Sequence, residues 1–106
     1  MSNQLNIGIL RQLCNSGQIK WTAHILERMQ ERDIHPSDVI NCIQSGEIIE
    51  QYPNAFPYPA CLILGTKTNN IYIHVVAGYG DGFVWIVTAY EPEENEWANG
   101  FKHRKG

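Results

Sequence analysis

The chain has 106 residues, of which 43% are hydrophobic and 18% are charged, and its formal net charge is −3 at pH 7. These values predict one globular domain over residues 1–106 and exclude a disordered chain. The negative charge argues against a general nucleic-acid binder, because neutralising phosphates takes clustered Lys and Arg. No apolar run could span a membrane, and the N-terminus does not resemble a signal peptide, so we expect a cytoplasmic protein.

Three helices are expected in the N-terminal half. Apolar residues recur at helical spacing over Leu5–Cys14. A second helix begins at Thr22, a residue that caps helix N-termini well, and ends around Asp33. A third begins at His35–Pro36 and ends at Gly46, because proline suits the first turn and glycine the end of a helix.

After Gly46 the pattern changes from helical to extended. The three prolines of Pro53–Pro59 indicate a loop, because proline cannot donate to a sheet ladder. Short polar or glycine-rich connections, Thr66–Asn70 and Gly78–Gly82, are typical of hairpins. The segments rich in β-branched and aromatic residues are 47–52, 61–64, 71–77 and 83–90. We therefore expect an α+β fold with the N-terminal helices packed on one face of a four-stranded antiparallel sheet.

Alternation assigns the side chains of the last two strands to faces. If the Gly78–Gly82 turn pairs Ala77 with Phe83, then Ile73 lies opposite Val87 on the side that faces the helices. A one-residue slip would bury His74 instead. On the other face we expect Tyr72, His74, Thr88 and Tyr90 together, with His74 and Thr88 as diagonal neighbours.

The segment from Trp21 to Arg32 predicts a helix that gathers polar side chains on one side. At about 100° per residue, His24 and Arg28 lie about 40° apart, and Glu31 lies close by. Arg32 is about 80° from His24 and is either a substrate contact or a surface ion-pair partner. On this helix alone, a solvated polar face with an Arg28–Glu31 pair is the simpler interpretation.

Imidazole, guanidinium and phenol groups on an open sheet face suit cleavage of RNA without a metal ion. The reaction needs a base for the ribose 2′-hydroxyl, a cation for the phosphate in the transition state, and an acid for the leaving oxygen. Histidine exchanges protons near neutral pH, and arginine holds phosphate through paired hydrogen bonds. No P-loop, HExxH or dinucleotide fingerprint indicates another chemistry, and we expect no cofactor.

These residues also have structural interpretations. Cys14, Cys42 and Cys61 lack metal-ligand spacing, so we expect buried free thiols and no metal site. His74 taken alone is more simply a half-buried sheet residue. Trp97 and Phe101, near the C-terminus, are expected to anchor that segment on the core.

The order of several motifs resembles a bacterial family of small domains of unknown function. The likeness covers nearly the whole chain past Lys20, and its His-x-x-x-Arg-Met and Thr-Ala-Tyr-x-Pro pieces are the most specific. That family is similar to the RelE, BrnT and MqsR toxins. The matching segments are Thr22-x-His24-x-x-x-Arg28-Met29-x-x-Arg32-x-Ile34, Gly46-Glu47-Ile48-Ile49-Glu50-x-Tyr52-Pro53, Ile73-His74-Val75-Val76, and Val87-Thr88-Ala89-Tyr90-x-Pro92 with Trp97.

This resemblance implies a RelE-like or barnase-like fold and a toxin-like endoribonuclease that cuts messenger RNA without metal. It also implies two partners, RNA (free or on a ribosome) and a cognate antitoxin protein, with no membrane and no direct DNA contact. His24 or His74 would carry the proton. Arg28 and Arg104 would hold phosphate, and Tyr90 would orient the substrate. The catalytic candidates are His24, Arg28, His74 and Tyr90, and the substrate-binding candidates are Arg32, Thr88, Lys102 and Arg104.

A second function class stays open beside the enzyme. A non-catalytic domain of the same fold would bind a protein partner through its open sheet face or through the proline-rich loop Tyr52–Pro59. Convergence of His24, His74 and Tyr90 on one cleft would favour the enzyme, and scattering would favour the binding domain.

Overall fold

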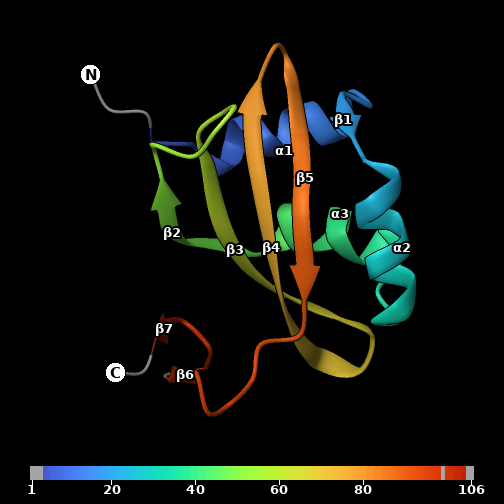
Figure 1. Cartoon of the computed structure of the whole chain (residues 1–106), viewed down its shortest axis with the longest axis vertical. Coiled ribbons are helices and arrows are strands. Elements are labelled where there is room, and N and C mark those ends of the chain that lie inside the picture. The colour runs from blue at the N-terminus through green and yellow to red at the C-terminus, as the bar shows by residue number, and fades with distance from the viewer. Residues whose placement is uncertain (1–3, 99, 105–106) are drawn as a thin grey trace.

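Three helices and a five-stranded sheet build the domain, as Figure 1 shows. This computed structural model describes residues 4–98 and 100–104. The helices are α1 (Ile7–Asn15), α2 (Ala23–Glu31) and α3 (Pro36–Ser45). The strands of the sheet are β1 (Ile19–Lys20), β2 (Glu47–Tyr52), β3 (Ala60–Lys67), β4 (Ile71–Gly80) and β5 (Phe83–Tyr90), with a 3-10 turn η1 (Thr68–Asn70) before β4. Near the C-terminus β6 (Trp97–Ala98) pairs with β7 (His103–Arg104). The α+β class is confirmed.

Polar groups fix the starts of α2 and α3 where the sequence predicts them. The hydroxyl of Thr22 accepts a hydrogen bond from the backbone N–H of Ile25 at 3.1 Å. At α3 the carboxylate of Asp38 accepts a hydrogen bond from the backbone N–H of His35 at 2.9 Å, and Pro36 occupies the first turn. Because these caps satisfy free backbone N–H groups, both helix starts are defined by local sequence.

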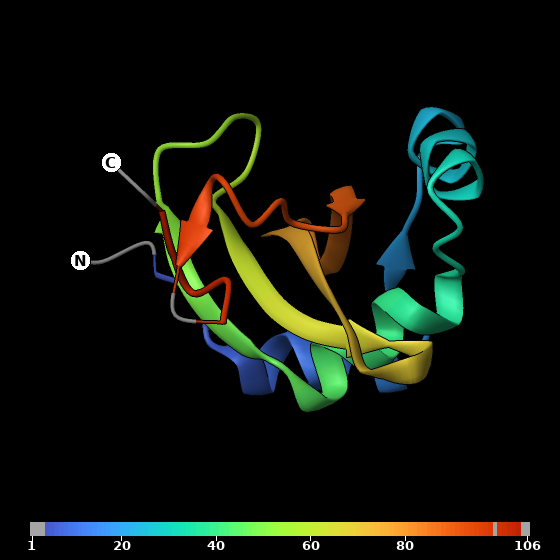
Figure 2. The same ribbon diagram turned by 90° about the horizontal axis from the view of Figure 1, so that it is seen from below.

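The core lies between the helices and one face of the sheet. α1 and α3 cover that face, while α2 lies at the β1–β5 edge (Figure 2). α2 still buries Ile25 and Met29 in the same apolar cluster. The cluster also holds buried residues of the other helices and of the sheet, among them Leu10, Val39, Cys42, Ile43, Cys61, Ile63, Ile73, Val75, Ala77, Val84, Ile86 and Ala89.

The sheet is mixed and has five strands, which corrects the expected four-stranded antiparallel sheet. Its order is β1-β5-β4-β3-β2, and β1 runs parallel to β5. β1 is only two residues long, so it shows no alternation that the sequence could reveal. It forms because the chain returning from α1 lies along β5, where the N–H of Val84 donates to the carbonyl of Gln18 at 3.0 Å.

The expected pairing of Ala77 with Phe83 is wrong, because the turn is tighter than expected and Ala77 pairs with Ile86. A tight turn pairs Gly80 with Phe83, and a bulge lies where the partners change from Ala77–Ile86 to Val76–Thr88. Val84, Ile86 and Ala89 therefore face the helices, and Phe83 and Trp85 face away from them. Past the bulge His74 lies directly opposite Tyr90 and diagonal to Thr88, so the predicted grouping of Tyr72, His74, Thr88 and Tyr90 agrees with the register.

The sheet face away from the helices, called the outer face here, carries a second buried layer. Leu62, Leu64 and His74 are buried on it, and Trp97 is buried against them. The C-terminal segment and the proline-rich loop lie over this face in Figure 2. The outer face is therefore accessible to solvent mainly where neither the C-terminal segment nor the proline-rich loop covers it.

Gly65→Ala is expected to destabilise the fold by about 1–3 kcal/mol through overpacking. A Cβ at position 65 would lie 2.6 Å from the sulfur and 2.9 Å from the Cα of Cys42, where α3 packs on β3. The free energy of unfolding in denaturant measures the effect. Gly78→Ala is the matched control, because its Cβ would meet its nearest neighbour, the carbonyl oxygen of Pro59, only at 3.4 Å. Equal losses in the two variants would refute this explanation.

Candidate functional site

The outer face brings His74 and Tyr90 into direct contact. The two residues are partners across β4 and β5, and the Nδ1 atom of His74 lies 3.2 Å from the Tyr90 hydroxyl. The Nε2 atom lies 2.9 Å from the backbone carbonyl oxygen of Phe101. His74 has 0% relative exposure, whereas Tyr90 is only partly buried. Tyr90 is thus the member of this pair that a bound molecule can touch.

Hydrogen bonding and burial together favour one protonation state of the pair. A carbonyl oxygen only accepts, so Nε2 must carry a proton and donate it to Phe101. Burial lowers the pKa of His74, which keeps the ring neutral and leaves Nδ1 as an acceptor for the Tyr90 hydroxyl. Burial likewise raises the pKa of Tyr90 and keeps the phenol protonated. The pair is therefore a neutral phenol donating to a neutral imidazole.

The C-terminal segment buries His74 and holds its ring in place. Trp97 meets the imidazole edge to face, with ring centroids 4.4 Å apart. The guanidinium of Arg104 lies 4.7 Å from the centre of the Trp97 ring, and its Nε donates to Glu50 at 3.1 Å. These contacts confirm that Trp97 anchors the segment, although the anchor point is the outer face and not the core beneath the helices.

Arg32 brings α2 to the same region. Its Nη1 donates to the backbone carbonyl of Ala89 at 2.9 Å and to the Thr88 hydroxyl at 3.4 Å. A cavity of about 400 Å³ lies beside it. The lining residues are Arg32, Tyr90, Glu91, Glu93 and Glu96. The cavity therefore offers one cation, one phenol and several carboxylates.

Of the predicted site residues, the structure gathers His74, Tyr90, Thr88 and Arg32. His24 and Arg28 are exposed on α2, and neither side chain forms a hydrogen bond or ion pair within residues 4–98 and 100–104. The expected convergence of His24 with His74 and Tyr90 on one cleft is not seen. The residue that reaches β5 is Arg32, the C-cap of α2, which lies about two turns after His24 and lines the cavity with Tyr90.

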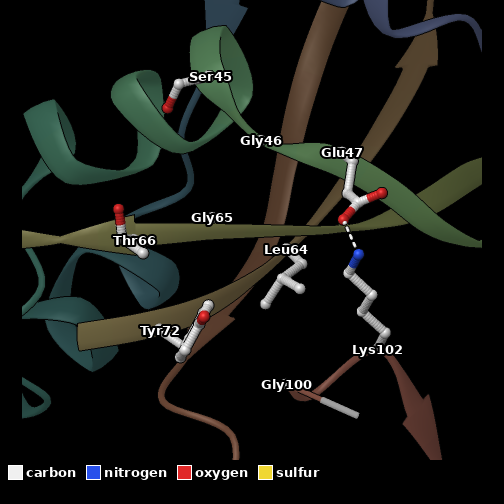
Figure 3. Close-up of a pocket in the computed structure, with 9 residues that line it drawn as sticks. All are labelled: Ser45, Gly46, Glu47, Leu64, Gly65, Thr66, Tyr72, Gly100 and Lys102. Carbon is white, nitrogen blue, oxygen red and sulfur yellow. Dashed lines mark ion pairs between the residues drawn. The ribbon is translucent and has the colours of Figure 1, made fainter. Parts of the chain in front are cut away.

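Lys102 and Arg104, the two substrate-binding candidates of the C-terminal segment, are already paired with carboxylates. Lys102 lies 2.8 Å from a carboxylate oxygen of Glu47 (Figure 3), and Arg104 binds Glu50. The Glu47–Lys102 pair borders a separate pocket of about 600 Å³ between β2, β3 and the C-terminal segment. Substrate binding by Lys102 or Arg104 would have to break these pairs.

Sequence reasoning missed Glu50 as a member of this network. The strand that carries it was predicted, but its face was not, because β2 shifts register between Ile48 and Glu50. Without that irregularity, alternation from Glu47 would have placed Glu50 on the opposite face.

Within the described ranges, no three His, Cys, Asp or Glu side chains gather so that they could hold a metal ion. None of the helices described is long and apolar enough to cross a membrane. The three cysteines are free, and Cys42 and Cys61 are buried, where desolvation raises each thiol pKa to about 12.

The chain matches a known protein family. A family model described as a domain of unknown function (DUF4258) matches residues 21–91. The chain belongs to this family. The matched region runs from just before α2 to the end of β5, and it includes His24, Arg32, His74 and Tyr90 but not the C-terminal segment. No match was found among curated proteins or among solved structures. The likeness to RelE, BrnT and MqsR toxins stays a prediction.

Lowering the pH from 7.5 to 5.5 is expected to destabilise the folded chain, in part through His74. Its pKa lies below the ordinary value of 6.5 in the folded state. As the pH falls below about 6.5, His74 of the unfolded chain binds a proton, whereas the buried His74 of the folded chain stays neutral. The free energy of unfolding therefore decreases until the pH falls below the lowered pKa of the folded state. His74→Gln should reduce this slope of unfolding free energy with pH. His103→Gln, at an exposed position on β7, is the control, and equal slopes in the two variants would exclude His74 as the cause.

Proposed function

We propose that this domain is a toxin-like, metal-independent endoribonuclease of a toxin–antitoxin module, with Tyr90 at its reacting centre. One observation carries the proposal. A half-buried phenol donates its proton to a buried neutral imidazole, beside a cavity that also contains a guanidinium. A phenol that is hydrogen-bonded to a base can pass a proton during cleavage of a phosphodiester, and a fixed cation beside it can stabilise the charge on the phosphate.

In the proposed reaction, the Tyr90 oxygen takes the proton of a ribose 2′-hydroxyl as its own proton passes to Nδ1 of His74. The 2′-oxygen attacks phosphorus, and the bond from phosphorus to the 5′-oxygen breaks. The leaving oxygen takes up a proton through the reverse relay from the imidazolium. The products are a 2′,3′-cyclic phosphate and a 5′-hydroxyl, so atoms and charge balance without another reactant.

Arg32 would stabilise the charge that develops on phosphorus. Its Nη1 donates to Ala89 and Thr88, while Nε and Nη2 have no acceptor among the described residues and keep donors for phosphate oxygens. The backbone carbonyl of Phe101 would hold the transient imidazolium of His74. His24 and Arg28, exposed on the same helix as Arg32, would meet the phosphates of neighbouring nucleotides. RNA and a cognate antitoxin are the partners that this proposal requires.

Tyr90→Phe is expected to lower RNA cleavage by roughly 100- to 10,000-fold, because it removes the proton relay but keeps the ring. The purified chain is incubated with RNA in the presence of a chelator, and the new ends are tested for 2′,3′-cyclic phosphate. Tyr79→Phe, an exposed tyrosine beside α1, is the control and should cleave as the wild type does. Intact RNA at high wild-type concentration, or full cleavage by Tyr90→Phe, would refute the proposal.

Expression of the wild-type chain alone in a bacterium is expected to arrest growth, and His24→Ala is expected to relieve the arrest. His35→Ala, at an exposed histidine outside the proposed site, should arrest growth as the wild type does. Colony counts after induction measure the effect, with protein levels checked by blotting. If the His24→Ala chain is as toxic as the wild type, His24 has no part in the site.

The carboxylates of the same cavity favour a second candidate, a non-catalytic protein-interaction domain. Glu91 is paired with Lys67 at 3.0 Å, but Glu93 and Glu96 face the cavity without an ion-pair partner among the described residues. Such a surface attracts a basic segment of a protein and repels phosphate. This candidate predicts no toxicity and a complex with the product of a neighbouring gene that is weakened by Glu93→Gln with Glu96→Gln.

A further inference from the structure

We propose that a groove of the outer face binds an unstacked base of single-stranded RNA next to the cleavage centre. The groove has a volume of about 550 Å³ and lies between the proline-rich loop and β5, with Thr22 of the α2 cap at its border. Its lining is mainly apolar and aromatic, and includes Phe56, Tyr58, Trp85 and Val87. This inference rests on the proposed endoribonuclease function and names a subsite for its substrate.

The aromatic wall of the groove is rigid before anything binds. Tyr58 and Trp85 stack with ring centroids 5.6 Å apart and planes at 29°. The indole N–H of Trp85 donates to the carbonyl of Gly80 at 3.0 Å. The Tyr58 ring lies so close to Gly80 that a Cβ there would clash with it. A fixed aromatic surface binds a base with little loss of side-chain entropy.

Charge at the edge of the groove favours RNA over an apolar peptide. Lys20 on β1 is the register partner of Trp85, and its ammonium lies 4.4 Å from the centre of the Phe83 ring. Among the described residues Lys20 has no ion-pair partner, whereas Lys67, Lys102 and Arg104 are paired with carboxylates. A free cation beside stacked aromatic rings matches the alternation of phosphate and base in a single strand.

The groove also leads toward the cleavage centre along β5. Val87, 57% exposed, lies between Trp85 and Thr88, and Thr88 is held by the same arginine that lines the Tyr90 cavity. At about 3.3 Å per strand residue, Trp85 and Thr88 are at most about 10 Å apart, and the bulge between them shortens this distance. One strand of RNA could thus place a phosphate near Tyr90 and a base in the groove.

The test measures the affinity for a fluorescent, non-cleavable 2′-O-methyl oligonucleotide, with the full chain and at several salt concentrations. Phe56→Ser removes a ring that is 95% exposed, so the fold should survive. It is expected to weaken binding about tenfold, since stacking on one aromatic ring supplies an effect of that size.

Lys20→Gln should lower the slope of log affinity against log salt by about 0.7. Ile9→Ser, an exposed residue of α1, is the control and should bind as the wild type does.

The outcomes separate the subsite from the catalytic proposal. Binding that depends on Phe56 without any cleavage would support the groove and refute the endoribonuclease. Cleavage with binding unchanged by Phe56→Ser and Lys20→Gln would overturn the groove and leave the catalytic proposal standing. The groove proposal also fails if Phe56→Ser abolishes a complex with a partner protein while oligonucleotide affinity stays unchanged.

Discussion

The buried imidazole of His74 connects three parts of the molecule that are distant in sequence. One ring nitrogen meets Tyr90 on β5, and the other meets the backbone of Phe101 in the C-terminal segment. The contact with Phe101 requires a proton on Nε2, and burial under Trp97 lowers the pKa of the ring and so favours its neutral form, in which Nδ1 accepts from Tyr90. The orientation of Tyr90 and the position of the C-terminal segment therefore depend on one side chain with two satisfied hydrogen bonds.

Charge on the outer face is arranged so that most cations are neutralised. Glu47 and Glu50 of β2 hold Lys102 and Arg104. Exposed ion pairs of this kind add little stability, but they position the C-terminal segment and reduce the positive charge of the surface. Among the described residues, Lys20 of β1 and Arg28 of α2 have no carboxylate partner, so the RNA binding that we propose would depend on cations of these elements.

Local patterns predicted much of the fold, and long-range pairing decided the rest. The caps at Thr22 and Pro36 depend only on residues that are adjacent in sequence, so the sequence alone predicted where both helices begin. The strand β1 has only two residues, too few to show an alternating pattern. The bulge before Thr88 cannot be predicted from alternation, because it interrupts the pattern only through the pairing with β4. The grouping of His74 with Tyr90 was nevertheless predicted, because the error in the turn and the bulge offset each other.

By itself the sequence determined the α+β class and the order of the three helices and four longer strands, because alternation and capping are local properties. The tertiary structure decided that His74 lies opposite Tyr90, because that pairing depends on the turn and on the bulge. Only the tertiary structure decided which cation reaches these residues. Arg32 joins them, while His24 and Arg28 stay exposed on the same helix. The reason is geometric: a helix presents several faces, and its angle to β5 selects one of them. That angle is set by packing of Ile25 and Met29 in the core, which no local pattern encodes.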